Sequence, residues 1–375
     1  MRLTDDQNAI REHIRAFAQE RLRPAAAAHE AAKGYPDALF AEMGEMGLWG
    51  MTAPADTGGA GMDYVAYALA LIEIAAADGA LSTIVSIQNS LIVGGLLKTG
   101  TPGQQARFLP DLIAGRAIGA FALTEAHAGS DASAIRTRAV REGDGWRLNG
   151  AKQFITSGKI ARLAIVYAVT DPAAGKRGLT GFLVPTDRPG YSVDKVEHKM
   201  GQAASDTCAI RFDDVLLEDA LRFGDEGGGY KLALSNLEAG RIGIAAQAVG
   251  MAQAALEIAA AYAKDRDSFG RPLIEHQAVG HRLADLWTKL EAARHMVLHA
   301  AAMKDAGEPC LTEASMAKLF ASEAAEAIVS GAIQTLGGYG YLEEYGLARI
   351  ARDVRVCQIY EGTSDIQRMV IARAL

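Results

Sequence analysis

The spacing of hydrophobic residues changes twice along this chain, and these two changes restrict its fold. Over residues 4–115 apolar side chains recur every three or four positions, for example at Ile10, Ile14 and Phe17. That spacing is typical of amphipathic helices. Over residues 118–224 the apolar segments are short, rich in β-branched residues, and separated by Gly, Pro and Asp turns. They predict about seven strands of an antiparallel sheet or barrel.

The helical spacing returns after a glycine cluster at residues 227–229. It predicts three long helices, at about residues 230–264, 276–305 and 311–336, and two shorter ones after them. Long helices joined by short links favour an antiparallel bundle. The order of helices, strands and helices, without βαβ alternation, argues against a doubly wound parallel sheet.

The length and composition of the chain agree with this order. Its 375 residues suffice for two or three domains. Charged residues make up 22% and hydrophobic residues 50%, as in ordinary globular proteins. We therefore predict an α+β multidomain protein with an all-α N-terminal domain (1–117), a middle antiparallel β-barrel (118–224) and a C-terminal helical bundle (225–375).

The acidic character of the chain bears on its partners and location. The net charge of −7 argues against a nucleic-acid partner, because binding to a phosphate backbone needs a basic surface. The N-terminus carries Asp5, Asp6 and Glu12 and has no apolar core, so we expect neither a signal peptide nor a transit sequence. Polar residues such as Gln247 interrupt the most apolar stretch, 241–263, which favours a core helix over membrane insertion.

Several common chemistries lack their usual residues in this sequence. Cys208, Cys310 and Cys357 are too few and too scattered for a disulfide framework or a zinc site, which favours a reducing cytoplasm. No GxGxxG follows a predicted strand, and the Walker loop, HExxH and GxSxG are absent. Nicotinamide, ATP, zinc-protease and serine-hydrolase chemistry are therefore not expected, and neither is a metal site.

A candidate catalytic carboxylate, Glu361, lies near the C-terminus. It precedes Gly362 and a predicted helix start that Thr363 would cap. Taken alone, a glutamate before a glycine is most often a solvated loop residue. The surrounding sequence QIYEGTSDIQR, at residues 358–368, resembles the C-terminal signature of the acyl-CoA dehydrogenase family. The resemblance implies that Glu361 is the catalytic base.

Two segments in the predicted sheet resemble the flavin-binding sequences of that family. They are FALTEAHAGSD at residues 121–131 and KQFITSG at residues 152–158. In the family these segments line the isoalloxazine ring, and hydroxyl and backbone N–H groups can bond the flavin edges. The implied flavin contacts are Phe121, Leu123, Thr124, Gly129, Ser130, Phe154, Ile155 and Thr156.

Segments of the C-terminal region resemble those that hold the rest of FAD and the substrate. RDSFG (266–270) resembles the pyrophosphate segment, and QTLGG (334–338) the loop that meets the adenosine half. EAGRIGI (238–244) resembles the helix that meets the CoA chain near the thioester. The implied FAD contacts are Arg266, Ser268, Phe269, Gln277, Gln334, Gly337, Gly338, Thr363 and Asp365, and the implied substrate contacts are Ser130, Glu238, Arg241 and Gly362.

The resemblance covers about residues 5–373, and the family fold of helical domain, β-barrel and four-helix bundle agrees with the predicted order. It implies an FAD-dependent dehydrogenase of fatty acid or branched-chain amino acid catabolism. Glu361 would take the α proton of an acyl-CoA while the β hydride passes to flavin N5, giving a trans-2-enoyl-CoA. It also implies electron transfer to an electron-transferring flavoprotein, and a homotetramer built as a dimer of dimers. The Ala- and Gly-rich helix faces at 242–261 agree with such an assembly.

Some positions depart from the family pattern. Ala126 replaces the usual proline and Phe154 the usual tryptophan, so flavin contact there is expected through backbone groups. One branch of the family carries its base at the position of Gly240, so Gly240 together with Glu361 indicates the other branch. Two alternatives are an acyl-CoA oxidase, which passes electrons to O₂, and a non-catalytic FAD-binding assembly protein. The chain length favours the dehydrogenase over the oxidase, and Glu361 with Arg241 argues against the non-catalytic protein.

The expected substrate follows from LSTIVSIQNSL at residues 81–91, which resembles short-chain and glutaryl members. The glutaryl enzymes have an arginine at the position of Ser82, where it would pair with a distal carboxylate. Because burying an unpaired carboxylate costs several kcal/mol, we expect a neutral acyl group of about four to six carbons, straight or methyl-branched. Leu91 and Ile92 could form either the pocket wall or plain core.

Overall fold

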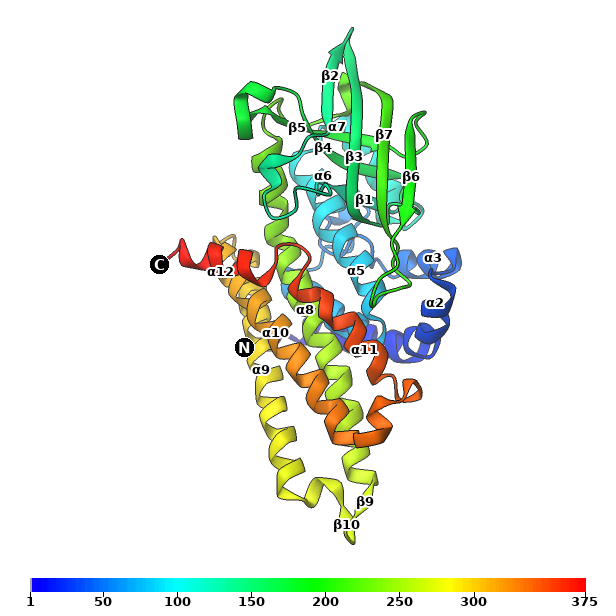
Figure 1. The fold of residues 1–375 in the computed structure, drawn as a ribbon, viewed down its shortest axis with the longest axis vertical. Coiled ribbons are helices and arrows are strands. Elements are labelled where there is room, and N and C mark those ends of the chain that lie inside the picture. Colours follow the sequence, from blue (N-terminus) through cyan, green and yellow to red (C-terminus); the bar gives the residue numbers. More distant parts are fainter. Residues whose placement is uncertain (1) are drawn as a thin grey trace.

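The structure, a computed structural model, describes residues 2–375 and has helices, a sheet and further helices in the predicted order (Figure 1). The sheet lies at one end of an elongated molecule, and the long C-terminal helices extend away from it. The N-terminal helices lie beside these long helices, between them and the sheet. This arrangement brings the three regions together around the middle of the longest helix.

The N-terminal region is helical, and polar side chains begin several of its helices. Thr4 and Thr101 each form a capping box with a glutamine three residues later. Asp78 accepts a hydrogen bond from the Leu81 backbone N–H at 3.0 Å. The helices are α1 (Asp5–Phe17), α2 (Ala26–Ala32), α3 (Asp37–Glu45), α4 (Tyr64–Ala77), α5 (Gly79–Ile87), α6 (Gly94–Thr99) and α7 (Pro102–Ile113), with a π-helical segment at Gln88–Val93.

The middle region forms one eight-stranded sheet with the order β6-β7-β3-β2-β4-β5-β8, and β1 pairs with β4 beside this path. The pairings of β1 and of β2 with β4 are parallel, and the remaining pairings are antiparallel. The strands are β1 (Gly119–Ala122), β2 (Arg138–Glu142), β3 (Gly145–Thr156), β4 (Leu163–Val169), β5 (Leu179–Pro185), β6 (Tyr191–Val196), β7 (Thr207–Glu218) and β8 (Arg222–Phe223).

The predicted antiparallel barrel is therefore corrected to an open, mixed sheet. Among residues 2–375, the two end strands β6 and β8 do not pair with each other. β8 has only two residues, so it offers too short a ladder for closure. β6 carries Asp194 and Lys195 as exposed charges, and charged side chains are a common protection of an edge strand.

The C-terminal region confirms the predicted helical pattern. The three long helices begin and end within one residue of the predicted bounds, and two shorter helices follow them. The region contains α8 (Gly229–Asp265), α9 (Gln277–Asp305), α10 (Leu311–Leu336), α11 (Leu347–Val354) and α12 (Ser364–Ala372), with a small hairpin of β9 (Asp267–Ser268) and β10 (Arg271–Pro272) between α8 and α9.

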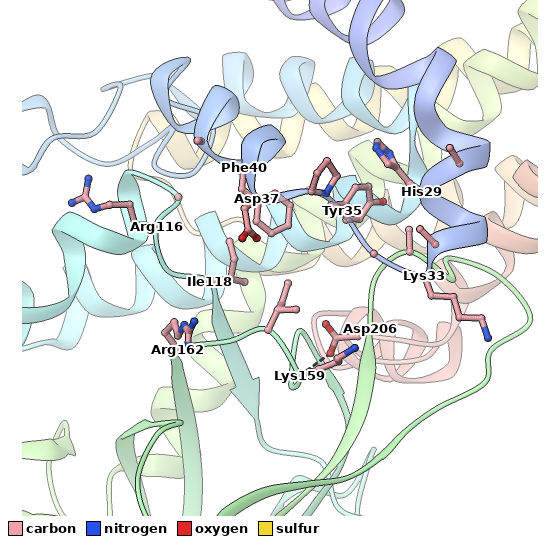
Figure 2. Close-up of a pocket in the computed structure, with 18 of the residues that line it drawn as sticks. His29, Lys33, Tyr35, Asp37, Phe40, Arg116, Ile118, Lys159, Arg162 and Asp206 are labelled. Carbon is pink, nitrogen blue, oxygen red and sulfur yellow. Dashed lines mark hydrogen bonds between the residues drawn. The ribbon is translucent and has the colours of Figure 1, made fainter.

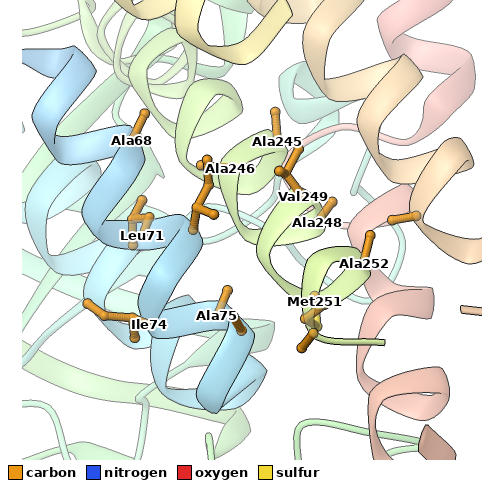
Figure 3. Packing of buried hydrophobic residues seen from close by; sticks show 14 of the residues in the cluster. Ala68, Leu71, Ile74, Ala75, Ala245, Ala246, Ala248, Val249, Met251 and Ala252 are labelled. Carbon is orange, nitrogen blue, oxygen red and sulfur yellow. The ribbon is translucent and has the colours of Figure 1, made fainter. Parts of the chain in front are cut away.

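Helix α8 is the central element of the core. Figure 3 shows side chains of α4 such as Leu71 and Ala75 next to Ala246 and Val249 of α8. A Cβ at Gly250 would lie 2.1 Å from the Ile72 carbonyl oxygen, so only glycine allows this helix approach. The close contact fixes α8, which carries several candidate site residues, against the N-terminal region.

Two apolar helical stretches, Gly79–Thr99 and Gly229–Asp265, have the length and composition of a membrane span. In each of them 89% of the apolar window is buried inside the protein. Core helices of large proteins have the same apolar character, so this length and composition are weak evidence for a membrane.

Candidate active site

Glu361 lies in a tight turn between a 3₁₀ turn at Arg355–Gln358 and α12. Its backbone is left-handed, with φ of 51°, and Gly362 follows with φ of 92°. The left-handed conformation costs a side-chain-bearing residue about 1–2 kcal/mol. Thr363 then caps α12, because its hydroxyl accepts a hydrogen bond from the Ile366 N–H at 3.4 Å. The predicted helix start is therefore present, and the turn before it needs support from its surroundings.

The carboxylate of Glu361 is buried and free of structural hydrogen bonds. Both of its oxygens are shielded from solvent, and neither has a hydrogen-bond partner among residues 2–375. Burial raises the pKa of Glu361 to about 7, against the opposing effect of the positive charges of Lys318 and Arg241. A group with this pKa exists near neutral pH in both its protonated and its ionised form.

Glycine at position 240 makes room for that carboxylate. A Cβ built on Gly240 would lie 2.0 Å from Oε2 of Glu361 and 2.9 Å from its Cδ. These distances are far below van der Waals contact, so a larger residue at this point of α8 would displace the carboxylate. The structure thus brings together two residues that are separated by 121 positions in the sequence.

Two further residues of α8 were predicted to contact the substrate. Arg241 is buried, and its Nε and Nη1 atoms have no hydrogen-bond partner among residues 2–375. Burial lowers the pKa of Arg241, and the charges of Glu361 and Glu238 oppose this effect. Glu238 instead pairs with Lys304, whose Nζ lies 3.2 Å from its Oε1. Arg241 therefore retains free donors beside Glu361, whereas the Glu238 carboxylate already has a partner.

The two predicted flavin segments lie side by side where β1 and β3 end. The Gln153 N–H donates a hydrogen bond of 2.8 Å to the Thr124 carbonyl oxygen, which joins the segment after β1 to the end of β3. Phe154 is left-handed, with φ of 60°, and 63% exposed. Thr124 and Thr156, in the same two segments, are half-buried.

Side-chain burial refines the predicted flavin contacts. The side chains of Leu123 and Ile155 are buried in the core beneath the sheet, so only their backbone groups can face a flavin. Gly129 and Ser130, in contrast, are exposed on the loop after β1. The geometry suits a ligand that lies across the ends of β1 and β3 and bonds backbone groups there.

A buried ion pair behind these segments was missed in the sequence. The Lys152 ammonium donates to the Leu123 carbonyl oxygen at 3.0 Å and to Glu125 Oε1 at 2.8 Å. Glu125 also accepts hydrogen bonds from the backbone N–H groups of Arg136 and Thr137, at 2.7 and 2.9 Å. The pair therefore connects both flavin segments with the next loop. Charged residues in strand-rich sequence usually face solvent, so only the fold reveals that this pair is internal.

Most of the remaining predicted FAD contacts lie at the opposite end of the molecule, whereas Thr363 and Asp365 lie at the start of α12, next to Glu361 in the chain (Figure 1). Arg266 ends α8 and its guanidinium lies 5.7 Å from the ring centre of Tyr339, which follows the predicted adenosine loop. Phe269, at the tip of the β9–β10 hairpin, is 96% exposed. At 1.5 Å per residue, α8 separates Gly240 from Arg266 by about 40 Å, and Figure 1 shows the hairpin far from the sheet.

The segment expected to form the acyl pocket is part of a buried polar network. Ser82 is fully buried; its hydroxyl donates to the Gly79 carbonyl oxygen at 2.7 Å and accepts from Gln247 Nε2 at 2.7 Å. Tyr360, next to Glu361, donates to the side chain of the same glutamine. Ile92 packs against β1, because a Cβ at Gly119 would meet its side chain at 2.4 Å. Of the two roles considered for Ile92, core packing is the one that the structure supports.

A large cavity lies elsewhere, between α2–α3 and the loop after β3 (Figure 2). Its volume is about 870 Å³, and its walls include Lys33, Arg116, Lys159, Arg162 and Asp206. In Figure 2 the Lys159 backbone bonds the Asp206 carboxylate, at an N–O distance of 2.9 Å. None of the predicted site residues lines this cavity, so it is separate from the candidate active site.

The whole chain is similar to known proteins. Three models of acyl-CoA dehydrogenase match it: the N-terminal domain at residues 4–116, the middle domain at 120–215 and the C-terminal domain at 227–375. The human mitochondrial short-chain specific acyl-CoA dehydrogenase is 44% identical over 370 residues, which are 99% of this chain and 90% of that protein.

Two solved structures share the fold over the whole chain. Butyryl-CoA dehydrogenase from Megasphaera elsdenii superimposes with a TM-score of 0.97 and 39% identity, covering 100% of this chain and 99% of the other. A chain in a structure described as the electron transferring flavoprotein of Acidaminococcus fermentans has a TM-score of 0.97 and 40% identity, covering 100% and 98%. Both likenesses extend over the helical regions and the sheet alike.

Proposed function

This chain belongs to the acyl-CoA dehydrogenase family, and from that we propose that it oxidises a short acyl-CoA to a trans-2-enoyl-CoA with Glu361 as the base. It is an FAD-dependent enzyme of the short-chain type. FAD, when bound, supplies the acceptor for the β hydride. The chain itself must remove the α proton, hold the thioester and keep water away from the reacting carbons.

The observation that carries the proposal is the free, buried carboxylate of Glu361. A base has to accept a proton from carbon, so it cannot be occupied by structural hydrogen bonds. A general base also works best when its pKa is close to the working pH, and burial raises the pKa of Glu361 to about 7. We infer that the unpaired donors of Arg241 and the backbone of Gly362 hold the substrate next to this carboxylate.

The flavin would bind at the ends of β1 and β3, at residues that suit it. The exposed Phe154, the hydroxyls of Thr124 and Thr156, and the backbone groups of the two joined segments offer both an apolar surface and hydrogen bonds. Arg266 and Phe269 lie about 40 Å along α8 from Gly240, beyond the reach of one dinucleotide bound near Glu361. We therefore propose that these two residues, with the loop 334–338, contact FAD in a neighbouring subunit, in a homotetramer of two dimers.

The acyl group would be short, neutral, and straight or methyl-branched. Ser82 supplies no cation for a distal carboxylate, and its hydroxyl is already bonded to Gly79 and Gln247. Each methylene that fits a pocket gains only about 0.8 kcal/mol, so rejection of longer chains depends on the end of the pocket. The likeness to a butyryl-CoA dehydrogenase and to a short-chain specific enzyme supports this range.

We further propose an electron-transferring flavoprotein as the electron acceptor, which the likeness to a chain from such a system supports. A reducing cytoplasm is the proposed location, because Cys208, Cys310 and Cys357 are all buried and unpaired. Neither proposal depends on the identity of the acyl group.

The test is anaerobic addition of butyryl-CoA to the purified yellow protein. The proposal expects loss of the oxidised flavin absorbance and formation of trans-2-butenoyl-CoA. No bleaching with any acyl-CoA from three to twelve carbons would indicate the non-catalytic alternative. Rapid formation of hydrogen peroxide when air is admitted to the product complex would indicate the oxidase alternative.

A further inference from the structure

Helix α10 carries a lysine in an unusual setting. The side chain of Lys318 is fully buried, and its Nζ donates a hydrogen bond of 2.6 Å to the carbonyl oxygen of Gly362. Among residues 2–375 this carbonyl oxygen is its only hydrogen-bond acceptor. Burial lowers the pKa of Lys318 to about 8, so at neutral pH most molecules retain the charge.

A buried ammonium without a carboxylate partner is costly, whereas an apolar side chain would fill the same space more cheaply. Such a residue in a folded protein therefore calls for a role beyond packing. The group that it contacts belongs to the turn that presents Glu361.

That turn has two consecutive left-handed residues, Glu361 and Gly362. Their carbonyl groups are held from two sides. Lys318 bonds Gly362 from α10, and Gln367, a fully buried residue of α12, donates to the carbonyl oxygens of Gly362 at 2.9 Å and of Glu361 at 3.3 Å. The hydrogen bonds restrain a conformation that the glutamate would not adopt readily by itself.

We propose that Lys318 is a positioning residue for Glu361: its ammonium group holds the left-handed turn through Gly362, and its positive charge favours the ionised form of the buried base. This inference rests on the proposed role of Glu361. Lys318 contacts neither substrate nor flavin, and it acts only through the turn and through its charge.

The charges around Glu361 determine what removal of Lys318 should do. The ionisable groups that face the carboxylate are Arg241 from α8, Lys318 from α10 and Tyr67 from α4. The two cations oppose the effect of burial on the pKa of Glu361, whereas burial raises the pKa of Tyr67 so far that it stays neutral. Without Lys318 the pKa of Glu361 should rise, and activity should require a higher pH.

The test uses Lys318→Met, which keeps the length of the side chain and removes its charge and hydrogen bond. Flavin reduction by butyryl-CoA is measured between pH 5 and 9 in the holoenzyme. We expect the acid limb of the pH–rate profile, where the rate falls as the pH decreases, to move up by about one pH unit, as for loss of a nearby opposite charge. The maximal rate should fall at least tenfold. Lys318→Arg, which retains the charge, should keep the acid limb at its wild-type position.

Two variants separate this role from general destabilisation. Gln367→Met removes hydrogen bonds of the same turn without a charge, so it should lower the rate and leave the acid limb in place. Lys199→Met removes a half-buried lysine that bonds Thr207 at 2.9 Å in the sheet region, and it should change neither. If Lys318→Met does not fold, Lys318→Gln retains a polar head and is measured in the same way.

A neutral variant at position 318 with the wild-type rate and the wild-type acid limb would overturn the proposal. An acid limb that shifts as far in Lys318→Arg as in Lys318→Met would also overturn it. The proposed function fails separately. If Glu361→Gln reduces its flavin at the wild-type rate, the base itself is wrongly assigned; if Glu361→Gln is inactive while Lys318→Met behaves as wild type, only the role of Lys318 is lost.

Discussion

Substitution of Gly240 by alanine should impair turnover through a single methyl group. The new Cβ would lie 2.0 Å from Oε2 and 2.9 Å from Cδ of Glu361, whereas ordinary contacts are 3.4 Å or longer, so the carboxylate must move by more than 1 Å. The atoms met are the far end of a flexible side chain, so the carboxylate can move aside at little cost in stability. A misplacement of about 1 Å at a reacting group can cost on the order of 100-fold in rate. We therefore expect kcat for butyryl-CoA to fall about 100-fold.

The assay is steady-state oxidation of butyryl-CoA with an artificial electron acceptor, together with thermal unfolding. Gly250→Ala is the matched control, because its Cβ would lie 2.1 Å from the Ile72 carbonyl oxygen on the same helix, away from Glu361. The control should lose stability and keep kcat. If Gly240→Ala retains more than half of the wild-type kcat, or if both variants lose activity equally, the carboxylate does not occupy the position described.

Three further predictions concern stability, cofactor and substrate. Burial raises the pKa of Glu361 from 4.5 to about 7, so the wild-type fold loses stability as the pH rises from 4.5 to about 7 and changes little above that. Glu361→Gln should therefore be more stable than wild type at pH 8 by up to about 3 kcal/mol and equally stable near pH 4. Equal melting temperatures at pH 8 would contradict this. Arg266→Ala should release FAD on gel filtration while keeping acyl-CoA affinity, and a wild-type monomer that retains FAD would speak against the shared site. In kcat/KM measurements butyryl-CoA should exceed octanoyl- and glutaryl-CoA; a preference for glutaryl-CoA, or a tenfold preference for octanoyl-CoA, would refute the proposed pocket.

The helices were predictable because the residues that determine a helix and its ends lie next to one another in the sequence. The bounds of α10 (Leu311–Leu336) agree with the prediction to the residue, since periodic apolar residues indicate the helix and Gly337 ends it. Closure of the sheet into a barrel was wrongly predicted. Closure depends on whether β6 pairs with β8, and no local sequence pattern indicates whether two distant strands pair. The parallel pairing of β1 with β4 is likewise a contact between distant segments. The domain boundaries at 117/118 and 224/225 stay predictions.

The site was predictable only in part. Glu361 and Gly240 could be proposed as a pair from family resemblance, but the distance between them is a property of the fold. Lys318 and Gln367 were missed because a single lysine or glutamine in a helix is usually a surface residue. Their contacts with the turn span 44 and 5 positions. An unexplained polar residue in the middle of an apolar, Ala-rich helix face is the feature that could have drawn attention to Lys318.

The role of Glu361 as the base is tested most directly by single-turnover flavin reduction in Glu361→Gln. The amide keeps the size of the side chain, so FAD content and the Kd for butyryl-CoA should stay within a few-fold of wild type. The rate of flavin bleaching by butyryl-CoA should fall by about 10²–10⁴-fold, the usual contribution of a general base, since Glu238, two positions before Gly240 on α8, is already paired with Lys304. A bleaching rate above one tenth of wild type, with unchanged binding, would contradict the account.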